Sequence, residues 1–409
     1  MKKQILSFLF LLTILLVGLS GFAAARKPKN ISSSNTEASS RLSSAQTKFG
    51  CKLFSQLVDR TPDSNIFISP ASIAFALAMT YNGAAGETRE AMARTLELGN
   101  MSLDDINRAN AALRASLQQL DPQVQLNLAN SLWARQGIEF KSEFLKRNQV
   151  AYGAELEVVD FSNPQALARI NAWVSQNTQG KIEKIVDRID PLDILFLINA
   201  LYFKGQWTEP FDQARTQKRI FTRADGRQLE HPMMSQGGVY KYYRGPKFQA
   251  VSLPYGQGRV SMDIFLPDRD SNLQEFFRHL NAETWQHWFS EFKMTPGDIV
   301  LPRFKLEYAA ELKEPLKTLG MAVAFDPNQG NFEHMVKQKA YISKVKHKTF
   351  IEVNEEGTEA AAATSVGVTI TAAPAQSRFN MVVDRPFFLS IRDQHTGTIL
   401  FMGAIVEPE

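Results

Sequence analysis

One stretch near the C-terminus constrains the fold of this 409-residue chain more than any other feature. Glu355–Arg378 lies between two segments with strong strand patterns, Tyr341–Val353 and Asn380–Ile391. A connection of more than 20 residues is unusual in a compact domain unless it serves a function. Gly357 can act as a hinge, and the four alanines Ala360–Ala363 let a backbone slide between neighbours. We refer to Glu355–Arg378 as the 355–378 segment.

The side chains of this segment alternate from Thr358 onward. One set is mostly apolar and grows larger along the chain: Thr358, Ala360, Ala362, Thr364, Val366, Val368 and Ile370. The other set is small or polar: Glu359, Ala361, Ala363, Ser365, Gly367, Thr369 and Thr371. A period of two indicates a strand with one buried face, and fourteen residues at ~3.3 Å each would span about 45 Å. The pattern favours a loop that can insert into a sheet; a long edge hairpin, or an Ala-rich helix over Glu355–Ala363 alone, stays open.

The N-terminus has the pattern of an export signal. Met1-Lys2-Lys3 precedes an apolar run, Ile5–Phe22, and Ala23–Ala25 fits an A-x-A cleavage site. We therefore expect a signal peptide over residues 1–25 and a secreted protein, extracellular or periplasmic, with no membrane contact after cleavage; the alternative is an uncleaved anchor. Residues 26–44 contain seven serines and are predicted to be a solvated tether. No second linker or repeat follows, so residues 45–409 are predicted to form a single domain.

The composition argues against several classes of protein. Lys and Arg number 46 against 42 Asp and Glu, which is too balanced for a strong nucleic-acid binder. The 44% share of hydrophobic residues favours a large core over disorder. The single Cys51 rules out an intrachain disulfide, the six histidines are scattered, and no phosphate-binding or zinc-protease motif occurs. We expect no nucleic acid, metal or cofactor.

Periodicity places helices early in the chain and strands later, which predicts an α+β fold. Helical patterns cover 46–60, a helix beginning at Pro70 after the capping residue Ser69, 87–98, 103–120, 141–152, 164–178, 271–290 and 309–319. Strand patterns cover 194–203, 239–243, 250–253, 260–266, 341–353, 387–391 and 398–406.

One short motif could suggest an enzyme. Ser290 and Lys293 match S-x-x-K, and His395-Thr396-Gly397 loosely resembles the K-T-G of penicillin-recognising enzymes. A serine beside a lysine is sound acyl-transfer chemistry. The pattern is short enough to arise by chance, however, and no S-D-N or Y-x-N accompanies it. An exposed helix turn and a hairpin turn are the simpler interpretation, and we do not expect an enzyme.

The chain resembles the serpin family over about residues 45–409. The resemblance is carried by Asn65-Ile66-Phe67-Ile68-Ser69-Pro70-Ala71-Ser72-Ile73, Asn199-Ala200-Leu201-Tyr202-Phe203-Lys204-Gly205-Gln206-Trp207, Glu355–Thr364, Val383-Asp384-Arg385-Pro386-Phe387-Phe388 and Gly397-Thr398-Ile399-Leu400-Phe401-Met402-Gly403. A further match covers Asn171-Ala172-Trp173-Val174 with Thr178–Ile182. These motifs occur in the family's order and are highly specific together.

The resemblance implies a fold of three β-sheets and about nine helices with an exposed reactive-centre loop. It also implies a metastable monomer that traps a serine endopeptidase. The protease cuts the loop and becomes an acyl-enzyme, and the cut loop then inserts into the large sheet. Family spacing from Gly357 places the scissile bond at Thr371-Ala372, while counting back from Pro386 gives positions near 372–375. Because both windows hold small residues and Arg378 lies too close to the next strand, we expect an elastase-like or subtilisin-like target.

The resemblance also assigns supporting residues. Glu355, Gly357, Thr358, Glu359 and Ala360–Ala363 match the hinge of inhibitory members without departure. Ser69, Ser72, Asn199 and His347 match a polar cluster, called the shutter, beneath the point where the large sheet opens. Glu355 and Arg303 match an ion pair at the top of that sheet, called the breach, with Trp207 beside it. The rival interpretation is a non-inhibitory serpin that acts as a carrier or chaperone, and the shutter could be ordinary core polarity.

Overall fold

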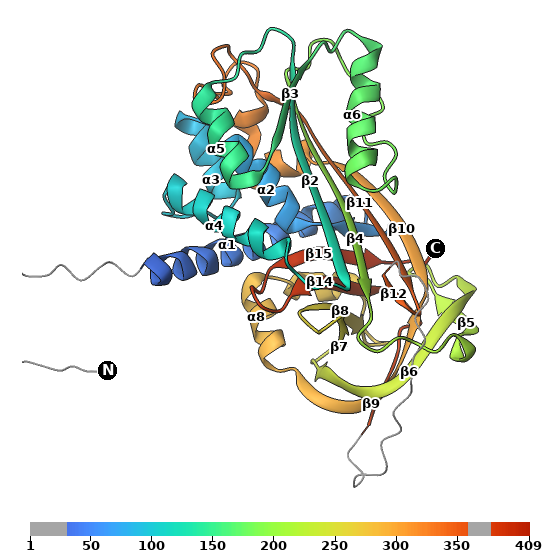
Figure 1. The fold of residues 1–409 in the computed structure, drawn as a ribbon. Helices are drawn as coiled ribbons and strands as arrows, with labels where there is room; N and C mark the ends of the chain where they lie inside the picture. The colour runs from blue at the N-terminus through green and yellow to red at the C-terminus, as the bar shows by residue number, and fades with distance from the viewer. Residues whose placement is uncertain (1–30, 359–377) are drawn as a thin grey trace, which may run out of the picture.

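The computed structural model describes residues 31–358 and 378–409 (Figure 1). The predicted signal peptide, the hinge residues Glu359–Ala363 and the predicted bond Thr371-Ala372 lie outside these described ranges. Within the ranges, no helix combines the length and the apolar character needed to cross a bilayer.

The site is built on a six-stranded sheet, which we call sheet A. Its strands run in the order β10 (Phe304–Glu311), β11 (Ile342–Asn354), β12 (Gly357–Thr358), β4 (Leu195–Gln206), β2 (Val124–Arg135) and β3 (Glu155–Val159). Helix α6 (Pro164–Asn177) covers one face of sheet A, where Trp173 packs with Phe196 and Tyr202 (Figure 1). The opposite face packs on the main core, beneath the helices of the first third of the chain. Residues of β4 therefore alternate between two hydrophobic layers.

The other strands of the described residues form one larger sheet. Its order is β1 (Ile66–Ile68), β15 (Ile399–Ile405), β14 (Phe387–Asp393), β8 (Val260–Pro267), β7 (Phe248–Tyr255), β6 (Gln228–Arg244), β9 (Lys293–Pro302) and β13 (Phe379–Val382), with β5 (Gln217–Thr222) beside β6. The long strand β6 changes partners along its length, from β5 to β9 to β7. β6 thus joins two of the three predicted sheets into one hydrogen-bonded sheet. The described strands therefore form two sheets, this larger one and sheet A.

The helices of the described residues follow the predicted order. They are α1 (Ile31–Arg60), α2 (Pro70–Tyr81), α3 (Gly86–Thr95), α4 (Leu103–Leu117), α5 (Ser142–Tyr152), α6, α7 (Leu273–His279), α8 (Ala282–Ser290) and α9 (Lys313–Leu316). Ser69 caps α2 as predicted, because its side chain accepts a hydrogen bond from the Ser72 amide and Pro70 occupies the first turn. The α+β class is confirmed.

Three sequence predictions about secondary structure are wrong. The Ser-rich stretch is helical from Ile31 onward, because Ala38, Leu42 and Ala45 repeat at helical spacing and are buried. The helix predicted over 309–319 begins only at Lys313, since the preceding residues continue β10. The helix predicted over 271–290 is two helices, and Asn281 caps the second with a capping box.

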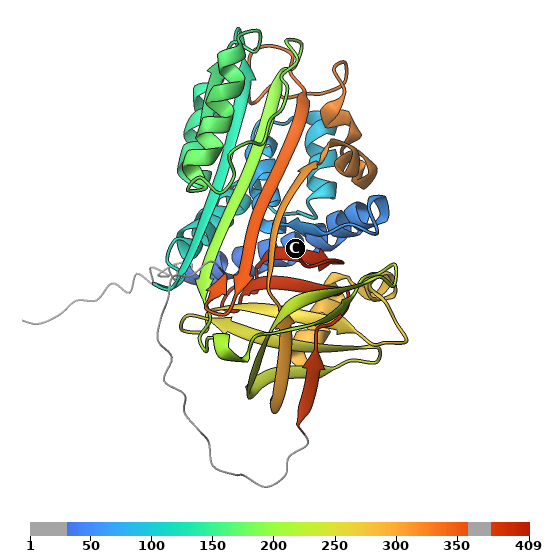
Figure 2. The ribbon, with the colours of Figure 1, turned by 90° about the vertical axis from the view of Figure 1, so that its right-hand side faces the viewer.

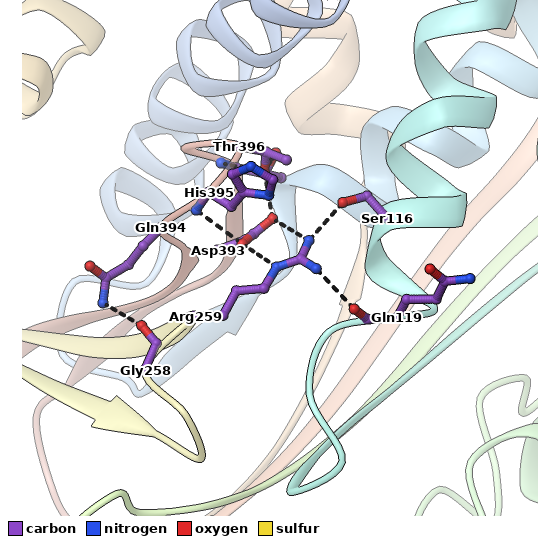
Figure 3. A network of polar contacts seen from close by, with 9 residues as sticks. Ser116, Gln119, Gly258, Arg259, Asp393, Gln394, His395 and Thr396 are labelled. Carbon is purple, nitrogen blue, oxygen red and sulfur yellow. Dashed lines mark hydrogen bonds and ion pairs between the residues drawn. The ribbon is translucent and has the colours of Figure 1, made fainter.

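A polar network fixes the turn between β14 and β15 (Figure 3). Arg259 donates to both carboxylate oxygens of Asp393, at 3.0 and 3.1 Å, and also to Ser116 and to the Gln119 carbonyl beyond α4. Burial alone would raise the pKa of Asp393, but the bonds from Arg259 and Thr396 outweigh it and hold this pKa below its usual value. The network joins the C-terminal hairpin to α4.

Candidate functional site

The beginning of the 355–378 segment is already part of sheet A. β12 lies between β11 and β4 and pairs antiparallel with both: Thr358 is opposite Val353 and Gly205, and Gly357 is opposite Asn354 and Gln206. Beyond β12, β4 and β11 pair directly with each other in parallel, from Leu195 with Ile342 to Tyr202 with Phe350. Figure 2 shows these two strands side by side, β4 in light green and β11 in orange. The described end of the segment therefore lies where the β4–β11 pair separates.

Gly357 and Thr358 fit this position for steric reasons. Gly357 has φ of 152°, and a Cβ there would lie 2.1 Å from the Gly205 carbonyl oxygen, so only glycine is accommodated. Thr358 is fully buried, and its hydroxyl is 2.7 Å from the Tyr255 hydroxyl. Burial raises the pKa of Tyr255, which therefore stays neutral. Sequence reasoning missed Tyr255, because nothing local links it to a residue about a hundred positions later.

The predicted ion pair is present just before β12. Glu355 is 2% exposed, and its Oε1 accepts from Arg303 Nε at 2.7 Å and from Thr216 at 2.5 Å. Trp207 lies beside this pair as expected: its indole N–H donates to the Asn354 carbonyl at 2.9 Å, and its ring stacks on Tyr255 at 4.4 Å. The turn between β11 and β12 is thus held by one charge pair and one aromatic stack.

The predicted polar cluster is also assembled, under the middle of sheet A. The Ser69 amide donates to His347 Nε2 at 3.2 Å, and His347 Nδ1 lies 2.5 Å from Asn199 Oδ1. Asn199 donates in turn to Ser72. Because Nε2 accepts, the proton of a neutral imidazole is on Nδ1, and desolvation lowers the pKa of His347 to about 3. The cluster joins β4, β11 and the start of α2.

A fifth member of this cluster was not predicted. Asn130 on β2 accepts hydrogen bonds from Ser72 and Asn199. Asn130 lies in Gln125–Ser131, where we predicted no strand, although apolar and polar residues alternate just before it, over Val124–Leu128. Its pairing opposite Asn199 places it there.

The other end of the 355–378 segment is held differently. Arg378 pairs with Asp298 at 3.1 Å, and Phe379 begins β13, which runs parallel to β9 at the edge of the larger sheet. The Phe379 ring packs directly over Gly297, where a Cβ atom would lie 2.2 Å from the nearest ring carbon. The same ring stacks on Tyr242, with 4.1 Å between the ring centroids. Side chains rather than two strand neighbours hold this end.

The motif that could suggest an enzyme does not form a catalytic arrangement. The Ser290 hydroxyl is exposed at the end of α8 and donates to the His287 carbonyl at 2.7 Å. Within the described ranges no hydrogen bond joins Ser290 to Lys293, and no group of three or more His, Cys, Asp or Glu is placed to hold a metal ion. A nucleophile needs a base within hydrogen-bond reach, which Ser290 lacks here.

Comparison with known proteins agrees with this geometry. The sequence profile of the Serpin family, described as serine protease inhibitor, matches residues 44–408. The leukocyte elastase inhibitor of Sus scrofa is 35% identical over 380 residues, which cover 90% of this chain and 100% of that protein.

Two solved structures have the same fold. The native state of tengpin, a thermophilic serpin, superposes with a TM-score of 0.82 at 30% identity, covering 94% of this chain and 96% of the other. Human thyroxine-binding globulin in complex with thyroxine gives 0.84 at 27% identity, covering 91% and 99%. With a profile match over nearly the whole described chain and the same architecture in solved serpins, the protein belongs to the serpin family.

Proposed function

We propose that this protein is a single-use inhibitor of serine endopeptidases. The protease's serine attacks the carbonyl of Thr371, the peptide bond to Ala372 breaks, the amine of Ala372 leaves with a proton, and an ester joins Thr371 to the enzyme. The segment that ends at Thr371 then inserts into sheet A and draws the protease with it. The proposal rests first on the position of β12 between β4 and β11.

The register of β12 supports insertion along the whole segment. If the pairing continued, each later residue would lie opposite the preceding residue of β4. Ala360 and Ala362 would then face the same layer as Phe203 and Leu201, and Val366 and Val368 the same layer as Leu197 and Leu195. All four of these β4 side chains are fully buried in the main core. The apolar set found in the sequence is therefore the set that would meet the core.

The small set would face the other layer. Ala361, Ala363, Ser365 and Gly367 would lie level with Tyr202, Ala200, Ile198 and Phe196, which pack under α6. Since α6 already fills that space with Trp173, Ile170 and Val174, only small side chains fit beneath it without overpacking. The alternation thus matches two different layers of one sheet.

The polar cluster lies on the path of insertion. In the same register, Thr364 would lie between Asn199 and His347, whose direct contact would have to break. A threonine hydroxyl can donate and accept, so it can replace part of the lost hydrogen bonding. We infer that this cluster controls the opening of the β4–β11 pair.

Insertion would be favourable because the new strand gains hydrogen-bond ladders on both edges. Antiparallel pairing on both sides would also replace a parallel pair, which is slightly less stable per residue. A protease held by its ester would be pulled against the end of the sheet. Distortion of its oxyanion site would then stop hydrolysis of the ester.

The residues around the bond favour a particular class of target. Thr371 and its neighbours Ala372 and Ala373 are small and uncharged, which suits a shallow or small apolar pocket. The similarity to a leukocyte elastase inhibitor supports an elastase-like enzyme, and a subtilisin-like enzyme fits the same chemistry. We also propose that residues 1–25 are removed on export and that the inhibitor acts as a secreted monomer.

The test is to mix the mature protein with pancreatic elastase and with subtilisin, and to analyse the products on denaturing gels and by mass spectrometry. We expect a complex that survives denaturation and a released peptide that begins at Ala372 or within three residues after it. Clean cleavage by both enzymes without a complex would overturn the inhibitory proposal. A peptide beginning after Arg378 would overturn the predicted bond and indicate a trypsin-like target.

The alternative is a non-inhibitory carrier, favoured by the similarity to thyroxine-binding globulin in complex with thyroxine. A heat-melt comparison separates the two functions. An inserting serpin should melt at a much higher temperature after the segment is cut, whereas a carrier whose loop does not insert should melt at the same temperature before and after cleavage.

A further inference from the structure

A second cluster of buried polar side chains lies where the C-terminal end of α2 meets α4 and α5. Asn82, at the C-cap of α2, donates to Asn107 on α4 and to Asn148 on α5, both at 3.1 Å. Asn107 donates back to Asn82 at 2.8 Å. All three side chains are buried, and we call them the amide cluster. Because a buried amide that loses its partner is costly, the amide cluster resists any movement of α2 relative to α4 and α5.

The amide cluster joins α2 to the part of the chain that carries the outer strands of sheet A. α4 leads into β2, β2 into α5 and α5 into β3, so these four elements form one continuous unit, residues 103–159. Within sheet A, β2 pairs with β4 from Val124 to Ala134, and β3 pairs with β2. Figure 1 shows α2, α4 and α5 on the same side of the sheet. The amide cluster therefore ties the C-terminal end of α2 to the half of sheet A that contains β4.

The N-terminal end of α2 is tied to the other half of the sheet, which contains β11 and β10. His347 on β11 accepts from the Ser69 amide at 3.2 Å. The hydroxyl of Thr349, also on β11, donates to the Phe67 carbonyl just before α2 at 2.5 Å. α2 has twelve residues and is thus about 18 Å long, and its two ends contact the two halves of sheet A.

We propose that α2 is a strap that holds the β4–β11 pair closed, with the amide cluster as its attachment on the β4 side; this rests on the separation of β4 from β11 that the proposed inhibitory function requires. When the two strands move apart, α2 can follow only one of them. If α2 stays with β11, the amide cluster must break, together with the contact of Ser72 with Asn199 on β4. If α2 follows β4, its two contacts with β11 must break instead. Opening therefore requires the release of one end of α2.

A strap has a signature that ordinary core packing lacks. The two ends of α2 are about 18 Å apart and share no hydrogen-bond partner, so substitutions at them should act independently if each only supports the core. In a strap, the release of either end removes the same resistance, and the release of the second end adds nothing. The effects of the two substitutions on the opening rate should then fall short of their product.

The experiment measures the opening of the β4–β11 pair without a protease. The probe is a fluorescent synthetic peptide with the sequence of residues 358–371, which can add as a strand between β4 and β11. Its rate of incorporation into the full mature chain at a fixed temperature reports how readily the two strands separate.

Two substitutions release the two ends of α2. Asn82→Leu with Asn148→Leu removes the amide cluster's links to α2, Thr349→Val removes a contact with β11, and a third protein combines all three changes. The matched control is Tyr152→Phe, because the Tyr152 hydroxyl on α5 bonds to Asn107 and Asn110 on α4, within one half of the molecule. Thr349→Val changes a single hydroxyl group, so it keeps the strap testable if the asparagine variant does not fold. Folding is checked by circular dichroism.

We expect the asparagine variant and Thr349→Val each to take up the peptide about tenfold faster than the parent, and the combined variant to be no faster than the faster of the two. Tyr152→Phe should stay within about twofold of the parent. Equal acceleration by Tyr152→Phe would mean that these side chains only support the core. That result would overturn the strap, as would no acceleration in the first two variants, or a combined effect equal to the product of the separate ones.

The inhibitory function is judged separately, by the complex of the parent with elastase or subtilisin. A complex with the parent, without acceleration of peptide uptake in the variants, would overturn the strap alone. The expected uptake rates without any complex would overturn inhibition and leave the strap in place.

Discussion

The two ends of the 355–378 segment are held in different ways. At the first end, Gly357 and Thr358 pair with a strand on each side, β11 and β4, and have almost no side chain that could resist movement. At the second end, β13 pairs with β9 alone, and the ring of Phe379 and the charge of Arg378 hold it in place.

The contrast indicates which half can move. A strand end held by backbone pairing between two neighbours can lengthen residue by residue as β4 and β11 separate, since each new residue then finds the same kind of partners. A strand end held by an aromatic stack over Gly297 must lose that contact before it shifts. In the proposed mechanism, a cut between the two ends would release the first half into sheet A and leave the second half on the larger sheet.

The largest effect should come from a charge at the movable end. Thr358→Arg puts a guanidinium at a fully buried position against Tyr255, where desolvation is costly. We expect the yield of the denaturation-resistant complex to fall more than about tenfold, with cleaved protein accumulating instead. Gel densitometry after mixing with elastase gives both quantities.

Asn380→Arg is the matched change at the fixed end, because Asn380 is exposed on β13. It should leave complex yield unchanged. Equal losses in the two variants would mean that both ends move.

Phe379→Ala tests the fixed end directly. The ring is 7% exposed and stacked on Tyr242, and its loss should lower the free energy of unfolding by about 3 kcal/mol, at the low end of the range because β13 is an edge strand. Denaturant unfolding measures this cost. We expect complex yield to be retained, since the fixed half does not take part in insertion, and Phe379→Tyr should behave like the parent. A fall in yield parallel to the fall in stability would contradict the division into two halves.

Glu355→Lys weakens the turn that precedes the movable end. It places two cations together where a buried carboxylate meets Arg303, and we expect a cost of about 2–3 kcal/mol, discounted because the Arg303 side chain is 41% exposed. β11 and β4 should then separate without cleavage, and size-exclusion chromatography after mild heating should show oligomers. Glu352→Lys makes the same charge change on β11 at a half-buried position. If both variants stay monomeric to the same temperature, the ion pair does not hold the sheet closed.

The smallest effect concerns pH. His347 is neutral in the folded protein down to a pKa of about 3, whereas an unfolded histidine takes up a proton near pH 6.5. Between these values the unfolded state binds more protons, so stability falls as pH falls, by at most about 1.4 kcal/mol per pH unit from this residue. Above pH 6.5 the contribution is constant. The free energies of unfolding of the parent and of His347→Gln, measured from pH 7.5 to 5, should converge as the pH decreases. If the two free energies instead change in parallel, His347 does not cause the loss of stability.

The sequence predicted the local part of this arrangement better than the distant contacts. The alternation after Thr358 is a local pattern that predicts a strand with one buried face, and it lies outside the described residues. The register against β4, which decides which set would meet the core, depends on pairing across more than 150 positions and has no local signal. Tyr255 and Gly297 escaped notice for the same reason, since each matters through a contact with a residue far along the chain.

One wrong prediction and one missed strand show how composition can mislead. The Ser-rich N-terminal stretch has the composition of a tether, yet Ala38 and Leu42 at helical spacing bury one face of α1. No strand was predicted over β2, where Asn130 and Ser131 interrupt the alternation of Val124–Leu128, although Leu132–Ala134 are fully buried. In both cases a few buried positions outweigh the average polarity.

The direct parallel pairing of β4 with β11 has a consequence for how such a protein would be used. A strand inserted between them would exchange one ladder for two, so the return step would have to break two ladders and re-form only one. No reset would follow, and each molecule would act once. Inhibition would then be stoichiometric. The amount of protease that could be inactivated would equal the number of intact inhibitor molecules present, and only new synthesis could restore it.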